Sequence, residues 1–76
     1  MDYDDFSSQC QFWTRFSEFL KQKYGYWQFI RGSIWRERYT VDISVINDKT
    51  GEVSLYSVTA YLDDDDQLHC GASRKS

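Results

Sequence analysis

Proline is absent from this 76-residue chain, and cysteine, histidine and glycine are scarce. The lack of proline is typical of regular elements that are joined by tight turns. The two cysteines, Cys10 and Cys70, are too few for a disulfide scaffold, and we expect reduced thiols rather than a bridge. No apolar run approaches the length of a transmembrane helix, and the first residues are acidic where a signal peptide is basic and then apolar. We therefore expect a cytoplasmic protein.

The scarcity of reactive side chains argues against an enzyme or a metalloprotein. His69 is the single histidine, so a nucleophile has only one candidate base and zinc has too few ligands. His69 and Cys70 are neighbours in a predicted strand and point to opposite faces, so they cannot easily share one ion. The four glycines form no phosphate-binding loop, and the run Asp63 to Asp66 lacks the glycine and glutamate of an EF-hand. We expect no catalytic residue, no cofactor and no metal.

The composition is that of one small folded domain, which we place over residues 1–76. Hydrophobic residues make up 41% of the chain, aromatic residues 18% and charged residues 28%, and this balance is typical of a globular protein. The net charge of −3 conceals an uneven distribution, because bases concentrate in residues 15–38 and acids in residues 39–73. An acidic total disfavours tight non-specific binding to nucleic acid, which depends on phosphate contacts from lysine and arginine.

A helix is predicted over residues 6–23, because apolar residues recur there at intervals of three and four. Two helix starts compete: Asp4 or Asp5 is one candidate N-cap, and Ser8 with a glutamine three residues later is the other. Gly25 is placed to end the helix in a left-handed conformation. The predicted core contacts join the helix to the sheet and comprise Trp13, Phe16, Leu20, Trp35, Val41 and Ile43.

Four strands are predicted after the helix. They cover residues 26–31, 34–46, 52–62 and 67–72. Gly32 and Ser33 separate the first two, and this pair suits a two-residue type II′ hairpin turn. Short turns join antiparallel neighbours. The predicted fold is therefore α+β: one N-terminal helix packed on a three- or four-stranded antiparallel meander sheet.

The register of the third strand is ambiguous in the sequence, because Val53 and Leu55 have the opposite parity to the apolar residues that follow them. A four-residue loop over 48–51 gives the larger number of apolar cross-strand pairs and is the register that we predict. It places Tyr56, Val58, Ala60 and Leu62 opposite Ile43, Val41, Tyr39 and Glu37. A bulge near Leu55 is the alternative that reconciles both sets of apolar residues.

The hairpin around Gly32 and Ser33 is the strongest candidate for a binding surface. In the predicted register, one of its faces carries arginines interleaved with aromatic and apolar side chains. The candidate binding residues are Trp27, Phe29, Arg31, Ile34, Arg36 and Arg38, with Val53, Leu55 and Tyr61 extending the surface on the third strand. A helix covers only one face of a sheet, and Trp, Tyr and Arg dominate interface hot spots. The alternative is cation–π pairing that merely covers the sheet.

Two functions from different classes fit this pattern. The first is a small protein-binding module without catalytic chemistry, which occludes a surface of a larger protein. A similar profile is common among proteins with which phages and mobile elements inhibit host machinery, anti-CRISPR proteins included. A second, acidic candidate surface is formed by Asp63, Asp64, Asp65 and Asp66. A homodimer through the sheet face is a further association that the pattern allows.

The alternative function is a single-stranded nucleic-acid-binding protein. Bases would stack on Trp27 and Phe29, while the three arginines of the hairpin contact the phosphate backbone. The acidic net charge disfavours this class. Binding that vanishes between low and physiological salt would support it, whereas salt-tolerant capture of a protein would support the first class.

Overall fold

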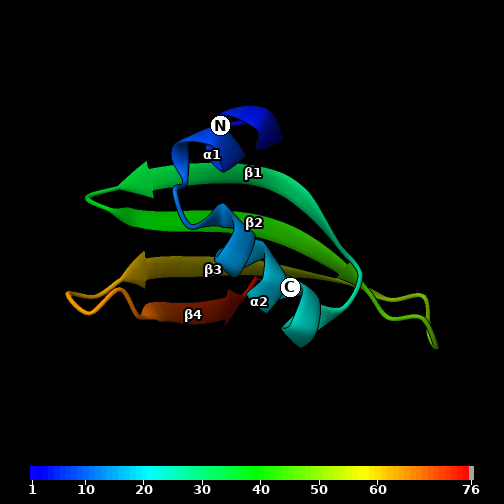
Figure 1. Ribbon diagram of the computed structural model, residues 1–76. Helices are drawn as coiled ribbons and strands as arrows, with labels where there is room; N and C mark the ends of the chain where they lie inside the picture. Colours follow the sequence, from blue (N-terminus) through cyan, green and yellow to red (C-terminus); the bar gives the residue numbers. More distant parts are fainter. Residues whose placement is uncertain (76) are drawn as a thin grey trace.

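The chain begins with two short helices in place of the one helix predicted over residues 6–23. The computed structural model describes residues 1–75, and its helices are α1 (Tyr3–Gln9) and α2 (Trp13–Tyr24) (Figure 1). The Asp2 carboxylate caps α1 by accepting a hydrogen bond from the Asp5 backbone N–H at 2.9 Å. Neither predicted N-cap position is therefore correct. The predicted end of the helix is confirmed, since Gly25 is the C-cap of α2 with φ +71°.

The interruption between the helices lets two phenylalanines face the sheet. Phe6 and Phe12 are six residues apart, so on one continuous helix they would point about 120° away from each other. Cys10 leaves the helical conformation with φ −86° and ψ 101°. Because of this break, both rings are buried, with Phe6 fully inaccessible and Phe12 8% exposed.

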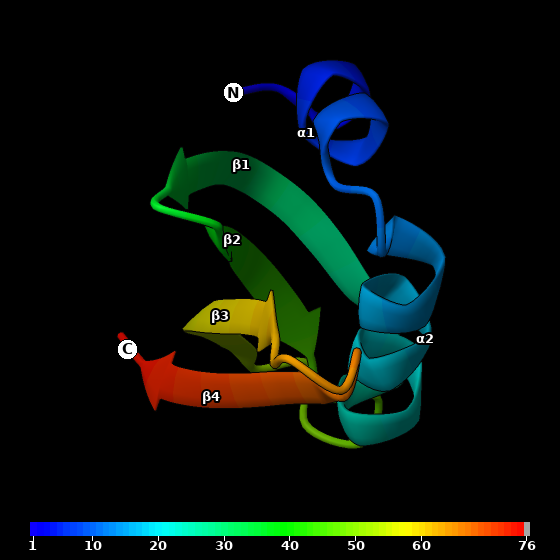
Figure 2. The same cartoon turned by 60° about the vertical axis from the view of Figure 1, so that its left-hand side comes forward.

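The four strands form one antiparallel sheet in the order β1-β2-β3-β4, and both helices lie on the same face of it (Figure 2). The strands are β1 (Trp27–Trp35), β2 (Arg38–Ile46), β3 (Val53–Leu62) and β4 (Leu68–Arg74). The predicted α+β fold with a meander sheet is thereby confirmed. Neither described helix has the length and apolar character that crossing a lipid bilayer requires.

The first hairpin turn lies at Arg36 and Glu37, and the predicted turn at Gly32 and Ser33 is wrong. Gly32 instead lies within β1, where it is buried beneath the Phe6 ring. The glycine therefore serves close packing of a helix side chain on the strand rather than a change of chain direction. The two turn residues have left-handed backbones, with φ +49° at Arg36 and +64° at Glu37.

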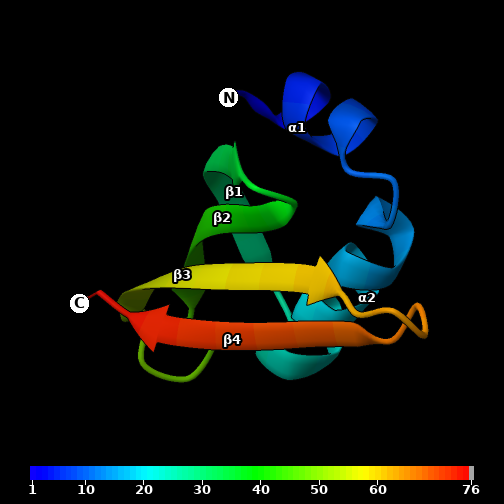
Figure 3. The same cartoon turned by 90° about the vertical axis from the view of Figure 1, so that its left-hand side faces the viewer.

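The register predicted between the second and third strands is confirmed. Tyr56, Val58 and Ala60 pair with Ile43, Val41 and Tyr39, respectively. These pairs lie on the face that the helices cover, while Val53 and Leu55 alternate to the other face. β3 and β4 continue the meander beside α2 (Figure 3). We call the helix-covered side of the sheet the inner face and the opposite side the outer face.

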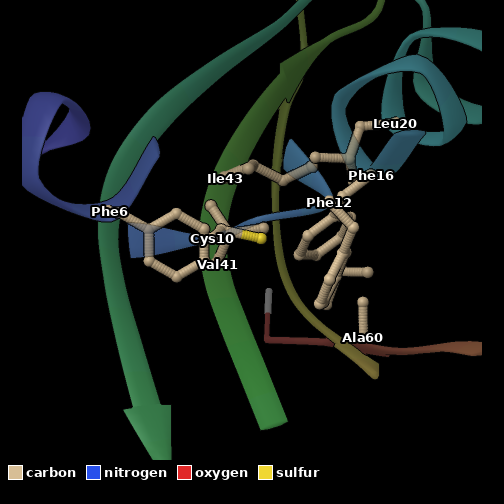
Figure 4. Packing of buried hydrophobic residues seen from close by; sticks show 9 residues of the cluster. Phe6, Cys10, Phe12, Phe16, Leu20, Val41, Ile43 and Ala60 are labelled. Carbon is tan, nitrogen blue, oxygen red and sulfur yellow. The ribbon is translucent and has the colours of Figure 1, made fainter. Parts of the chain in front are cut away.

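Nine apolar residues form the buried core between the helices and the inner face (Figure 4). They are Phe6, Cys10, Phe12, Phe16, Leu20, Val41, Ile43, Val58 and Ala60. Phe16, Leu20, Val41 and Ile43 confirm the predicted core, and Trp13 packs against it while remaining partly exposed. Trp35 does not belong to the core, because it lies on the outer face with 70% of its surface exposed.

Candidate functional site

The six predicted binding residues do not share one face of the sheet. Trp27, Phe29 and Ile34 are partly buried and pack against the core on the inner face. Arg31 and Arg38 point from the outer face, and Arg36 lies in the turn. The predicted aromatic–arginine surface of the hairpin is therefore divided between two sides of the sheet.

A β-bulge in β1 explains why residues that were predicted to share one face of the sheet lie on different faces. The pairing of β1 with β2 shifts between Phe29 and Arg31, so Ile30 is an extra residue. Such a bulge reverses which sequence parity faces the core. Before it, odd-numbered Trp27 and Phe29 face inward; after it, even-numbered Gly32 and Ile34 do so.

The outer face carries a row of planar side chains, one from each strand. Trp35 on β1 pairs with Arg38 on β2, and Tyr61 on β3 pairs with His69 on β4. The Arg38 guanidinium joins the two pairs, because its Cζ lies 4.5 Å from the centroid of the Tyr61 ring. We call Trp35, Arg38, Tyr61 and His69 the aromatic–arginine row.

Contacts between rings and guanidinium groups hold the side chains of this row in place. The rings of Tyr61 and His69 are nearly parallel, with centroids 5.0 Å apart and planes 12° apart. Arg38 and His69 come from the strands on either side of β3, so they occupy opposite faces of the Tyr61 ring. At one end of the row, Arg36 covers Trp35 with its Cζ 5.2 Å from the ring centroid. Both faces of the Tyr61 ring are therefore covered, whereas Trp35 keeps 70% of its surface exposed.

His69 also ties the row to the acidic loop between β3 and β4. Its Nε2 lies 2.7 Å from the Asp63 carboxylate. The same carboxylate accepts hydrogen bonds from the backbone N–H groups of Gln67 and Asp65. The hydrogen bond with His69, followed by that from Gln67, holds the pKa of Asp63 below its ordinary value. The turn predicted over residues 63–66 is confirmed, and its first aspartate organises it.

An ionic cluster occupies the outer face four residues further along the strands, around Asp42. Asp42 lies 3.0 Å from Arg31 Nε and 3.4 Å from Lys75 Nζ. Burial alone would raise the pKa of Asp42, but hydrogen bonds from Arg31, Ser57 and Lys75 hold it below the ordinary value. Between this cluster and the row, Thr40 and Thr59 share a 2.8 Å hydrogen bond.

The charges of the molecule are sorted by position. The outer face and the turn at Arg36 and Glu37 carry the bases Arg31, Arg36, Arg38 and Lys75, and the acids Asp42 and Glu37 lie among them. The acidic loop lies at the same end of the sheet as the row. Asp63, Asp64, Asp66 and Glu37 line a hollow of about 370 Å³ there, which opens on the helix-covered side, where Phe12 and Tyr39 also line it. Within residues 1–75 no three His, Cys, Asp or Glu side chains are grouped as metal ligands. A basic surface thus borders an acidic one.

The thiols and the histidine lie on different sides of the sheet. Cys10 is buried in the core, and Cys70 faces inward on β4 beside it. Burial raises the pKa of both thiols, which keeps them protonated and weakly nucleophilic. Cys70 has the opposite parity to His69 on the same strand. The histidine therefore does not activate the neighbouring thiol.

Trp35 and His69 are the members of the row that the sequence did not indicate. The sequence predicts Trp35 in the core because it shares the parity of Tyr39 and Val41, but the turn at Arg36 and Glu37 separates it from those residues. The signal was available in Glu37, whose charge breaks the apolar alternation at the position that forms the turn. Tyr61 lies on the outer face and is partly buried there between Arg38 and His69.

Comparisons of the chain with protein-family models, with curated proteins and with solved structures gave no significant match. Function is therefore inferred from the outer face alone.

Proposed function

We propose that this protein is a non-enzymatic protein-binding module that docks on a larger protein through the outer face of its sheet. The observation that carries the proposal is the aromatic–arginine row on the face that neither described helix covers. Trp, Tyr and Arg are the residues that most often dominate interface hot spots. Trp35 is 70% exposed although its ring is among the most costly to leave in water.

Apolar side chains extend the surface beyond the row. Ile30, Ile46 and Val53 are each about half exposed or more, at 51%, 47% and 56%. Exposed apolar groups beside polar and charged ones are typical of interaction surfaces. A module of this size acts by covering a surface of its partner, and the inhibitory role expected from the composition would follow from that occlusion.

Protein is favoured over single-stranded nucleic acid as the partner. Stacking of successive bases needs several free ring faces. Trp35 is exposed, but both faces of Tyr61 are already occupied by Arg38 and His69. A strand of phosphates along the row would also approach the loop that contains Asp63 and Asp64. A protein surface with separate acidic and basic patches complements both regions.

Affinity capture with a structure-based control tests this function. Tagged wild-type protein and a Trp35→Ala/Tyr61→Ala variant are each incubated with lysate of the source cells, with and without nuclease treatment, and bound proteins are quantified by mass spectrometry. We expect one partner that the variant binds about thirtyfold more weakly, corresponding to a loss of about 2 kcal/mol at a hot spot. Tyr26→Ala is the matched control, because Tyr26 is 83% exposed but lies outside the row.

Two results would overturn the proposal. Equal capture by the wild type and the double variant would exclude the row as the binding surface. Capture that disappears on nuclease treatment would instead assign the outer face to nucleic acid.

A further inference from the structure

Arg36 and Arg38 are oriented by rings rather than by acids. Arg31, on the same face, forms an ion pair with Asp42. In the part of the chain that the structure describes, no carboxylate lies within ion-pair distance of Arg36 or Arg38, including that of Glu37 between them. Their guanidinium groups lie over the rings of Trp35 and Tyr61 instead, with Cζ 5.2 Å and 4.5 Å from the ring centroids. Stacking uses the flat side of a guanidinium and leaves its N–H edge available for hydrogen bonds.

The two arginines also line the same hollow on the surface. It has a volume of about 150 Å³ and is bordered by Arg36, Glu37, Arg38, Tyr61 and Leu62. A carboxylate group fits a space of this size, and the forked guanidinium matches its two oxygens with parallel hydrogen bonds. The hollow therefore offers a seat for an oxyanion.

The turn at Arg36 and Glu37, which borders this hollow, contains residues that are unfavourable in its backbone conformation. Both of its residues have left-handed backbones, a conformation in which two-residue hairpin turns favour Asn-Gly. Arginine and glutamate are strained there, since their Cβ atoms crowd the backbone. Backbone strain of this kind is concentrated at functional sites. The strained turn lies beside two arginines that form no ion pair in the described structure, and this is a second, independent indication of a binding site.

We infer that Arg36 and Arg38 form an oxyanion seat that takes the carboxylate side chains of an acidic segment on the protein partner. This inference rests on the proposed function and specifies the chemistry of the surface that the outer face recognises. The charge pattern selects the occupant. A local acidic segment can place a carboxylate between the arginines, whereas a continuous polyanion would also have to pass the aspartate loop nearby.

An NMR titration of the isolated protein tests the seat directly. The probes are a short peptide with a Glu-Glu pair, the same peptide with Gln-Gln, and an oligothymidylate of the same net charge as the first. We expect saturable shifts of the side-chain Nε–H signals of Arg36 and Arg38 with the glutamate peptide alone. The Nε–H signal of Arg31 is the internal control, because Asp42 already occupies it. Shifts of all three arginines alike, no shifts, or tighter binding of the oligothymidylate would each overturn the inference.

Matched arginine-to-lysine variants separate fork geometry from charge. Arg38→Lys keeps the charge but loses the planar fork, and we expect it to bind the glutamate peptide about tenfold more weakly. Arg31→Lys makes the same change at a paired arginine and should bind as the wild type does. Equal affinities of the two variants would contradict the seat. A concentration-dependent dimer that Arg38→Lys dissociates would also contradict it, since the occupant would then be a second copy.

The capture experiment keeps the two proposals distinguishable. If Trp35→Ala/Tyr61→Ala loses the partner while Arg38→Lys retains it at full affinity, the outer face binds protein and the oxyanion seat is refuted. If neither variant changes capture while the peptide still shifts Arg36 and Arg38, the proposed function fails at that surface.

Discussion

Substitution of Gly32 by alanine tests how the helices are seated on the sheet. Gly32 lies within β1 directly beneath Phe6, and an added Cβ would overlap the Cγ, Cδ1 and Cε1 atoms of that ring. Phe6 is fully buried, so the ring has no open space to enter. Overpacking of this kind costs about 1–3 kcal/mol, and the cost would approach the 3–5 kcal/mol typical of losing a phenylalanine if α1 lifted away. In a domain of this size, 2 kcal/mol lowers Tm by about 8–16 °C.

Thermal and denaturant unfolding of Gly32→Ala give the measurement, and Gly71→Ala is the control. Gly71 lies in β4 with no heavy atom within 4 Å of an added Cβ, so alanine there should leave stability nearly unchanged. The double variant Phe6→Ala/Gly32→Ala isolates the cause, because the alanine at position 32 should cost little once the ring is gone. If Gly32→Ala still lowers stability when Phe6 is alanine, the packing explanation is refuted. The glycine would then be needed for its backbone conformation, as in a turn with positive φ. Equal stability of Gly32→Ala and Gly71→Ala would refute it as well.

Four further changes test other parts of the structure. Phe16→Ala should destabilise the fold by about 3–5 kcal/mol in chemical unfolding, and a loss below about 1 kcal/mol would place the ring outside the core. The Tyr24 hydroxyl is buried without a hydrogen-bond partner in the described structure, so Tyr24→Phe should leave stability unchanged or raise it, by up to about 1 kcal/mol. Glu37→Gly should raise Tm by relieving the left-handed strain, and an unchanged or lower Tm would contradict that strain. The pKa of Asp42 is lowered in the folded state, so its contribution is complete above its ordinary value of 3.8 and is lost as the pH falls through the folded value. Asp42→Asn should therefore be less stable at neutral pH and lose less stability below pH 3.8; a parallel acid titration of both proteins would count against the cluster with Arg31.

Much of the architecture was predictable because it depends on local signals. The alternation in β2 and the loop before β3 were sufficient to give the register of Val41 with Val58. The positive φ of Gly25 follows from its place after the last helical turn. In both cases the decisive residues lie close together in the sequence.

The first hairpin was not predictable from local signals, because it contains two irregularities. The bulge at Ile30 reverses the parity of β1, and the turn at Arg36 and Glu37 uses residues that disfavour its conformation. Gly32 offered a more familiar turn signal but is required for a contact with Phe6, which is distant in the chain. Only tertiary packing distinguishes a glycine that turns the chain from one that makes room for a ring.

The break between α1 and α2 has the same origin. The apolar stripe from Phe6 to Leu20 is compatible with one helix, and no proline or glycine interrupts it. The segment forms two helices because Phe6 and Phe12 are both buried, and one straight helix cannot direct both rings to the sheet. The gain from burying a large aromatic ring exceeds the loss of a few helical hydrogen bonds.

Net charge is a poor guide to the partner when the charges are sorted in space. The total of −3 argued against nucleic acid, yet the outer face itself is basic. The stronger argument against nucleic acid is that opposite charges lie close together. Glu37 and Asp63 lie at the same end of the sheet as Arg36 and Arg38. Such adjacency disfavours any long polymer of uniform charge and favours a partner whose own charges alternate over the same distance. Because the core lies entirely on the inner face, the outer row can be altered with little effect on folding, which makes recognition and stability separable by mutation.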